Sequence, residues 1–134
     1  MYLLDTMVLS ELRKSRPDRG AQAWLQKQPD EALFLSVMSL GEIERGIERQ
    51  RALDPGFAAE LQHWAETLCT QFSDRLLPVT AQIARRWGRL SARVGHDGAD
   101  LVIAATALCH GLTVVTRNTR HFKPSGALVL DPFG

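Results

Sequence analysis

The chain has 134 residues, of which 45% are hydrophobic, and a formal net charge of +1. A chain of this length is near the usual size of one domain and can bury a core without staples, so we expect a single domain over residues 1–134. No stretch approaches the ~20 apolar residues of a membrane helix. The near-zero net charge argues against a protein that coats nucleic acid non-specifically. The two cysteines, Cys69 and Cys109, are isolated, which indicates reduced thiols and a cytoplasmic protein.

The first half of the chain predicts strands followed by helices. A short apolar run ends at Leu4 and predicts a first strand; Asp5 follows it, and Thr6 is the predicted cap of a helix that reaches Lys14. Residues 15–20 are typical of a loop, 21–28 of a short helix and 33–37 of a second strand. The next helix is expected over residues 39–50, with Ser39 as its cap and Glu42 at the capping-box position.

The second half continues the alternation. Pro55 marks a helix start, and Thr80 is the predicted cap of a later helix. Gly111 is expected to end a helix over residues 100–110. The remaining elements are a helix through residue 72, strands over residues 76–77, 112–116 and 128–130, a loop over 95–98 and a turn or short helix over 118–122. This alternation predicts an α/β fold, a three-layer αβα sandwich around a central, mainly parallel sheet.

Three acids stand near the junctions of these units: Asp5, Glu42 and Asp100. Each has a structural alternative, because Asp5 suits a helix cap, Glu42 a capping box and Asp100 the first turn of a helix, with Asp97 as the cap of that helix. Open parallel sheets, however, bind ligands at the carboxyl ends of their strands. Three carboxylates gathered there would repel one another unless a cation lay among them, and oxygen ligands suit a hard ion such as Mg²⁺.

Four segments carry a resemblance to a known family: LLDTMVLSEL, SVMSLGEIERGIER, LPVTAQIARRWGRL and DLVIAATALCHGLTVVTRNTRHF. In order and spacing they resemble the PIN-domain toxins of the VapC type, especially the FitB-like branch. The resemblance implies an endoribonuclease that uses Mg²⁺ or Mn²⁺, acts on a structured RNA such as tRNA, and is neutralised by a cognate antitoxin. It also implies a homodimer that reaches operator DNA only indirectly, through the antitoxin.

Residue by residue, the resemblance implies that Asp5, Glu42 and Asp100 are the catalytic acids and metal ligands. Thr6 and Thr116 match site-supporting hydroxyls of the family. The chain departs from many members at Met7, where they carry asparagine, and at Asn118, where they carry a fourth acid. Asn118 and Asp97 are further candidate ligands. Arg117 and Arg120 follow the fourth strand and are candidates for binding either RNA phosphates or the antitoxin.

Other functions fit the sequence less well. A haloacid-dehalogenase-type phosphatase would need a second acid where this chain has Met7. A receiver domain would need an acceptor aspartate after the third strand, where the chain has Pro78. The alternative that stays open is a weakly active or inactive PIN-domain partner that serves mainly in an autorepression complex of antitoxin and operator DNA.

Overall fold

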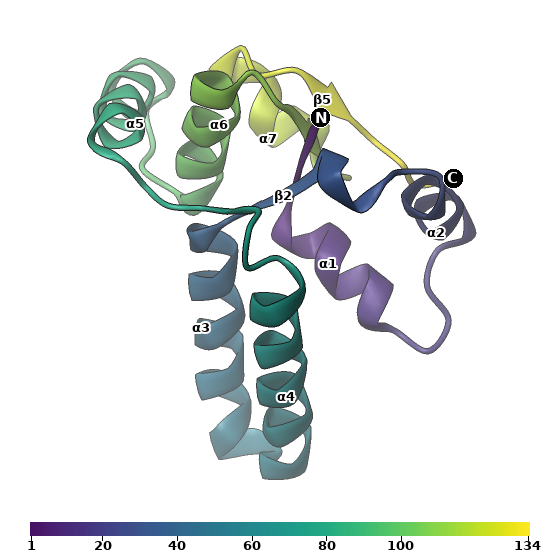
Figure 1. Cartoon of the computed structure of the whole chain (residues 1–134). Coiled ribbons are helices and arrows are strands. Elements are labelled where there is room, and N and C mark those ends of the chain that lie inside the picture. Colours follow the sequence, from purple (N-terminus) through teal and green to yellow (C-terminus); the bar gives the residue numbers. More distant parts are fainter.

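The computed structural model describes residues 1–134 and contains a five-stranded sheet with every strand parallel to its neighbours (Figure 1). The strand order is β3-β2-β1-β4-β5, which confirms the predicted α/β architecture. The strands are β1 (Tyr2–Leu4), β2 (Leu33–Ser36), β3 (Leu76–Leu77), β4 (Thr113–Val115) and β5 (Val129–Leu130). The chain leaves β1 in one direction to form β2 and β3, and later returns to form β4 on the other side. The sheet therefore has its topological switch point between β1 and β4, where open parallel sheets bind ligands.

Helices and short 3-10 turns connect the strands. They are α1 (Thr6–Arg13), α2 (Arg19–Gln26), η1 (Asp30–Ala32), α3 (Val37–Leu53), α4 (Pro55–Gln71), α5 (Ala81–Val94), α6 (Ala99–His110), α7 (Thr119–Phe122) and η2 (Lys123–Ser125). None of the helices is both long enough and apolar enough to cross a membrane. Figure 1 shows α3 and α4 side by side, extending away from the sheet as a long hairpin.

Adjacent residues of the central strands send their side chains to opposite faces of the sheet, as the two-residue period of a strand requires. Leu4 packs in a core cluster with residues of α1, α3 and α4. Leu3 packs in a second cluster, which contains Ile103 and Ala104 of α6 and Phe122 of α7. Helix α5 lies outside α6 and is joined to it through a third, smaller cluster. The sheet is thus covered on both faces, which is why its central strands are continuously apolar.

Several predicted boundaries are confirmed. Pro55 is the first residue of α4, Thr80 caps α5 by accepting a hydrogen bond from the Ile83 amide, and Gly111 ends α6 with a φ of 66°. Only glycine adopts this left-handed conformation without strain, so the Gly111 signal is reliable. The predicted third strand, Leu76–Leu77, has the observed bounds.

Three predicted helix caps are wrong. Helix α3 begins at Val37 and is capped by Ser36, not Ser39, so Ser39 and Glu42 form no capping box. The cap of α1 is Asp5 rather than Thr6. Asp97 does not cap α6, because Gly98 occupies the cap position and no side chain binds there. In each case the cap is a residue one to three positions earlier or later in the chain. The point where the preceding strand or loop ends decides which residue caps the helix.

Candidate functional site

Asp5 lies at the switch point, directly after β1 and next to the end of β4. Its amide donates to the carbonyl of Val115 at 3.0 Å. Its carboxylate is 5% exposed and accepts two hydrogen bonds, one from the Thr6 amide to Oδ1 at 2.8 Å and one from the Thr116 hydroxyl to Oδ2 at 2.9 Å. Asp5 therefore caps α1 and also stands at the carboxyl edge of the sheet, so the two alternatives for this residue are compatible.

Burial has a large effect on the ionisation of Asp5. It raises the pKa of Asp5 from its ordinary value of 3.8 to about 6. The hydrogen bonds from Thr116 and Thr6 act in the opposite direction, and the negative charges of Asp100 and Glu42 add to the rise in pKa. The ionised carboxylate is thus costly in this position, and a nearby cation would relieve that cost.

Glu42 lies in the second turn of α3 and is linked to α1 through Thr6. The Thr6 hydroxyl donates to Glu42 Oε1 at 2.7 Å, and its oxygen lies 2.9 Å from Ser39 Oγ. Since a hydroxyl carries one proton, the consistent arrangement has Ser39 donating to Thr6 and Thr6 donating to Glu42. The other carboxylate oxygen of Glu42 lies 3.9 Å from a guanidinium nitrogen of Arg45.

Asp100 lies in the first turn of α6 and is half-buried. Its Oδ2 lies 3.3 Å from Nδ1 of His121, a residue of α7. Asp5, Glu42 and Asp100 therefore come from the N-terminal parts of three different helices, and Asp100 and Glu42 lie near enough to Asp5 for their charges to act on it. They do not form a closed ligand group, because no set of three His, Cys, Asp or Glu side chains is gathered tightly enough to hold an ion.

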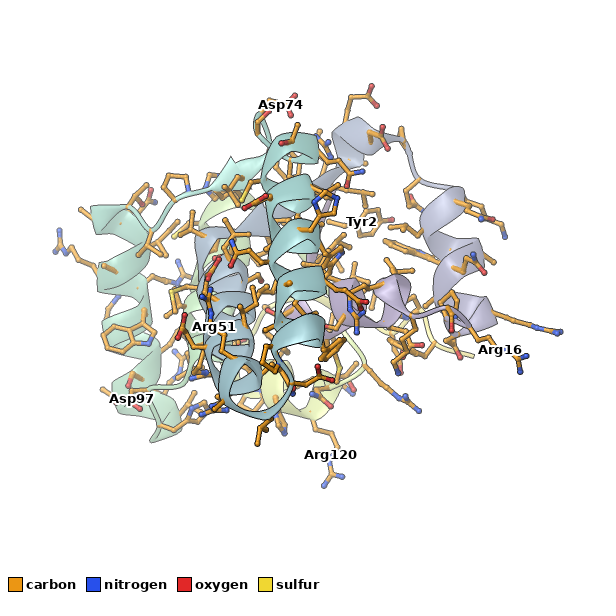
Figure 2. All side chains as sticks on the ribbon, turned by 90° about the horizontal axis from the view of Figure 1, so that it is seen from below. Tyr2, Arg16, Arg51, Asp74, Asp97 and Arg120 are labelled. Atoms are coloured by element: carbon orange, nitrogen blue, oxygen red, sulfur yellow. The ribbon has the colours of Figure 1, made fainter.

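The segment after β4 extends this region. The Asn118 amide donates to Thr116 Oγ1 at 2.9 Å, so the buried Thr116 hydroxyl connects Asn118 to Asp5. The Arg117 guanidinium stacks 4.9 Å from the centroid of the Phe133 ring. Arg120 is exposed and extends away from the helices in Figure 2. A polar recess of about 530 Å³ is lined by Arg117, Asn118, Thr119, Arg120 and His121.

Asp97 lies apart from these contacts. It is exposed in the loop between α5 and α6, appears near the edge of the molecule in Figure 2, and its side chain makes no hydrogen bond or ion pair. Its assignment as an additional ligand stays a prediction.

Two features of the region were not predicted from the sequence. Ser39, which the sequence suggested as a helix cap, is instead fully buried beside Thr6, and this contact joins residues 33 positions apart. The second feature is an apolar cavity of about 700 Å³ between α1, α2 and α4, whose lining includes Leu9, Leu12, Leu25 and Trp64. A space between three helices has no signature in the sequence of any one of them.

Known proteins match the chain along nearly its whole length. The family model of the PIN domain matches residues 2–126. VapC ribonuclease Y4jK of Sinorhizobium fredii is 34% identical, over 99% of this chain and 98% of the relative. Toxin FitB of Neisseria gonorrhoeae is 31% identical, over 99% of each chain.

Solved structures agree with the sequence relatives. The crystal structure of FitAcB from Neisseria gonorrhoeae superposes with a TM-score of 0.84 at 31% identity, covering 98% of both chains. The structure of FitAB bound to an IR36 DNA fragment gives a TM-score of 0.85 at 30% identity, covering 100% of this chain and 96% of that one. The chain therefore belongs to the PIN-domain family, among the toxins of the VapC type.

Proposed function

We propose that this protein is a metal-dependent endoribonuclease and the toxin of a toxin–antitoxin pair, with Asp5, Glu42 and Asp100 as its catalytic acids. The observation that carries the proposal is the Asp5 carboxylate, buried and doubly hydrogen-bonded at the switch point of the sheet, with two further acids close enough to raise its pKa. The names of the relatives, VapC ribonuclease and FitB toxin, support the same reading.

The donor set suits a divalent cation such as Mg²⁺ or Mn²⁺. It consists of carboxylate oxygens, with the Asn118 side chain nearby, and hard cations prefer oxygen ligands. Asp5 and Asp100 would hold the ion, with Glu42 as a ligand or through a bound water. When bound, the ion lowers the pKa of a coordinated water and offsets the negative charge at the scissile phosphate.

The surrounding residues keep the acids in place and receive the substrate. Thr116 and the Thr6 amide fix both oxygens of Asp5, and the Thr6 hydroxyl fixes Glu42. Positioning of this kind avoids reorganisation during the reaction. Arg117 and Arg120 line the polar recess beside Asp100 and suit contact with phosphates on either side of the cleaved bond.

We further propose that a cognate antitoxin binds the apolar cavity between α1, α2 and α4. Its lining combines leucines and Trp64 with Arg13 at the edge, so it fits a mainly apolar segment of the antitoxin. A homodimer and an RNA target such as tRNA also stay proposals for this chain.

A weakly active partner in an operator complex is the second candidate. The observation that favours it is the similarity to FitAB bound to DNA. The two candidates differ in a simple experiment: expression without an antitoxin stops growth only if the nuclease activity is substantial.

The direct test uses purified, antitoxin-free protein with structured RNA, in Mg²⁺ or in EDTA. We expect cleavage in Mg²⁺, none in EDTA, and none from Asp5→Asn or Asp100→Asn variants that remain folded by circular dichroism. Cleavage that survives EDTA or both substitutions excludes catalysis by carboxylates and a metal.

A further inference from the structure

Helix α5 carries four arginines and no acidic residue. At 100° per residue, Arg85, Arg86, Arg89 and Arg93 fall within an arc of about 100° on the helix surface. The apolar face, on which the buried Ile83 and Leu90 pack against Ala105 of α6, is centred about 100° farther around the helix. We call the four arginines the α5 ridge.

The ridge is a concentration of unpaired positive charge. Three of its members, Arg85, Arg89 and Arg93, are exposed and Arg86 is half-buried. None of the four takes part in an ion pair, a side-chain hydrogen bond or a cation–π contact. Elsewhere the basic groups have acidic or aromatic partners more often, as with Arg45, Arg51 and Arg75. In a chain with a net charge of only +1, this local excess is not a property of the whole surface.

The fold places the Arg93 end of the ridge near the start of α6, where Asp100 of the candidate active site lies. Helices α5 and α6 pack against each other and are joined by residues 95–98 alone, so they form a hairpin whose connected ends are adjacent. Arg93 lies in the last turn of α5 and Asp100 in the first turn of α6. Arg89 and Arg85 follow at intervals of about 6 Å along the helix axis. An RNA strand that runs from the acid site along α5 would therefore meet one guanidinium after another.

From this geometry we propose that the α5 ridge binds the phosphate backbone of RNA flanking the scissile bond. The proposal rests on the nuclease function proposed above and extends it by assigning a substrate-binding surface outside the acid site. Guanidinium groups match phosphate oxygens in a bidentate geometry. Arginine also anchors protein interfaces, so loss of the antitoxin complex is measured below as a separate outcome.

The test measures binding and its dependence on salt. The probe is a fluorescently labelled single-stranded RNA of mixed sequence, titrated with the full chain carrying Asp5→Asn so that cleavage does not intervene. Each phosphate neutralised on a single strand contributes about 0.7 to the slope of log K against log salt. Replacing Arg85, Arg89 and Arg93 with glutamine is expected to reduce the slope by about 2, equivalent to roughly 100-fold weaker binding at 0.1 M salt.

A matched control removes the same charge at the other side of the molecule. Arg16, Arg19 and Lys27 are exposed and form no ion pair, and Figure 2 shows Arg16 far from the α5 end marked by Asp97. The triple glutamine variant of these residues should keep the RNA affinity and the salt slope of the parent within the error of the titration.

The outcomes separate this proposal from the nuclease function. Equal losses in the ridge and control variants, or no loss in either, overturn the ridge proposal. The ridge proposal is also overturned if the ridge variant keeps its RNA affinity but no longer binds the antitoxin. That result assigns the ridge to a protein partner. Cleavage is measured separately, on the wild-type protein. If the wild type does not cleave RNA, the proposed nuclease function fails. If the ridge variant, but not the control, still loses RNA affinity and salt dependence, the ridge stands as an RNA-binding surface.

Discussion

Replacing Asp5 with asparagine is expected to stabilise the protein at neutral pH while it abolishes catalysis. A rise in pKa from 3.8 to about 6 corresponds to a penalty of about 3 kcal/mol on the ionised form in the folded state. Because the folded state holds the proton more tightly than the unfolded state, stability falls as the pH rises from 3.8 to about 6. Above that window the penalty is complete, and below it the penalty is absent. Asparagine has no such charge at any pH.

The magnitude is isolated by comparing two pH values. Asparagine changes the hydrogen bonds from Thr6 and Thr116 at every pH. We therefore measure how much the free energy of unfolding of the variant exceeds that of the wild type, once at pH 8 and once near pH 3. Subtracting the second value from the first leaves the effect of the Asp5 charge. Urea unfolding in EDTA should give about 3 kcal/mol in favour of the variant. Asp30→Asn, at an exposed side chain without a hydrogen bond, should give a difference near zero.

A divalent cation should act on the wild type alone. If Mg²⁺ binds among the acids, it stabilises the folded state by RT ln(1 + [Mg²⁺]/Kd) and removes part of the Asp5 penalty. A difference between pH 8 and pH 3 that is no larger for Asp5→Asn than for Asp30→Asn would refute the reasoning, because the buried carboxylate would then carry no measurable cost.

Three further perturbations test other contacts. Thr116→Val removes the hydrogen bond that lowers the pKa of Asp5, so the acidic limb of the pH profile of kcat/KM should move to higher pH. The control is Thr106→Val, at a buried threonine whose hydroxyl donates only to the backbone of its own helix; it should leave the acidic limb in place. Gly20→Ala should destabilise the fold by about 1–3 kcal/mol, since its Cβ would lie 2.7 Å from the Gly134 amide; Gly46→Ala, which meets nothing within 4 Å, should stabilise α3 by up to about 1 kcal/mol in the same urea titration. Leu12→Glu should abolish co-purification with the antitoxin without reducing RNA cleavage by the isolated chain, and a retained complex would exclude the apolar cavity as its binding site.

The sequence predicts the elements well where local chemistry fixes them. Pro55 at a helix start, Gly111 at a helix end and the Leu76–Leu77 strand before Pro78 all depend on backbone preferences of single residues. The Ser39 cap fails because Ser36, three positions earlier, is an equally good cap, and the end of β2 decides between the two. Local preference cannot make that choice, since the strand ends where its pairing with β1 and β3 ends.

The candidate site shows a similar division. The acids could be identified because Asp5 follows a strand and Glu42 and Asp100 lie near the beginnings of helices, and parallel strands place such positions along one edge. The hydrogen bonds that hold the acids could not be predicted. Thr6 donates to Glu42, 36 positions later in the chain, and Thr116 donates to Asp5, 111 positions earlier. Hydroxyls carry no sequence signal for a partner at that separation.

The hydrogen bond between Thr116 and Asp5 has a consequence for a chain still being synthesised. One of the two side chains is made almost first and the other almost last, and β4 must insert beside β1 before they meet. In a growing polypeptide on the ribosome, Asp5 therefore lacks its hydrogen bond from Thr116 until the C-terminal segment has emerged from the exit tunnel. Under the nuclease function proposed above, the site is complete only after translation has passed β4, which would leave time for a neutralising protein made alongside it to accumulate.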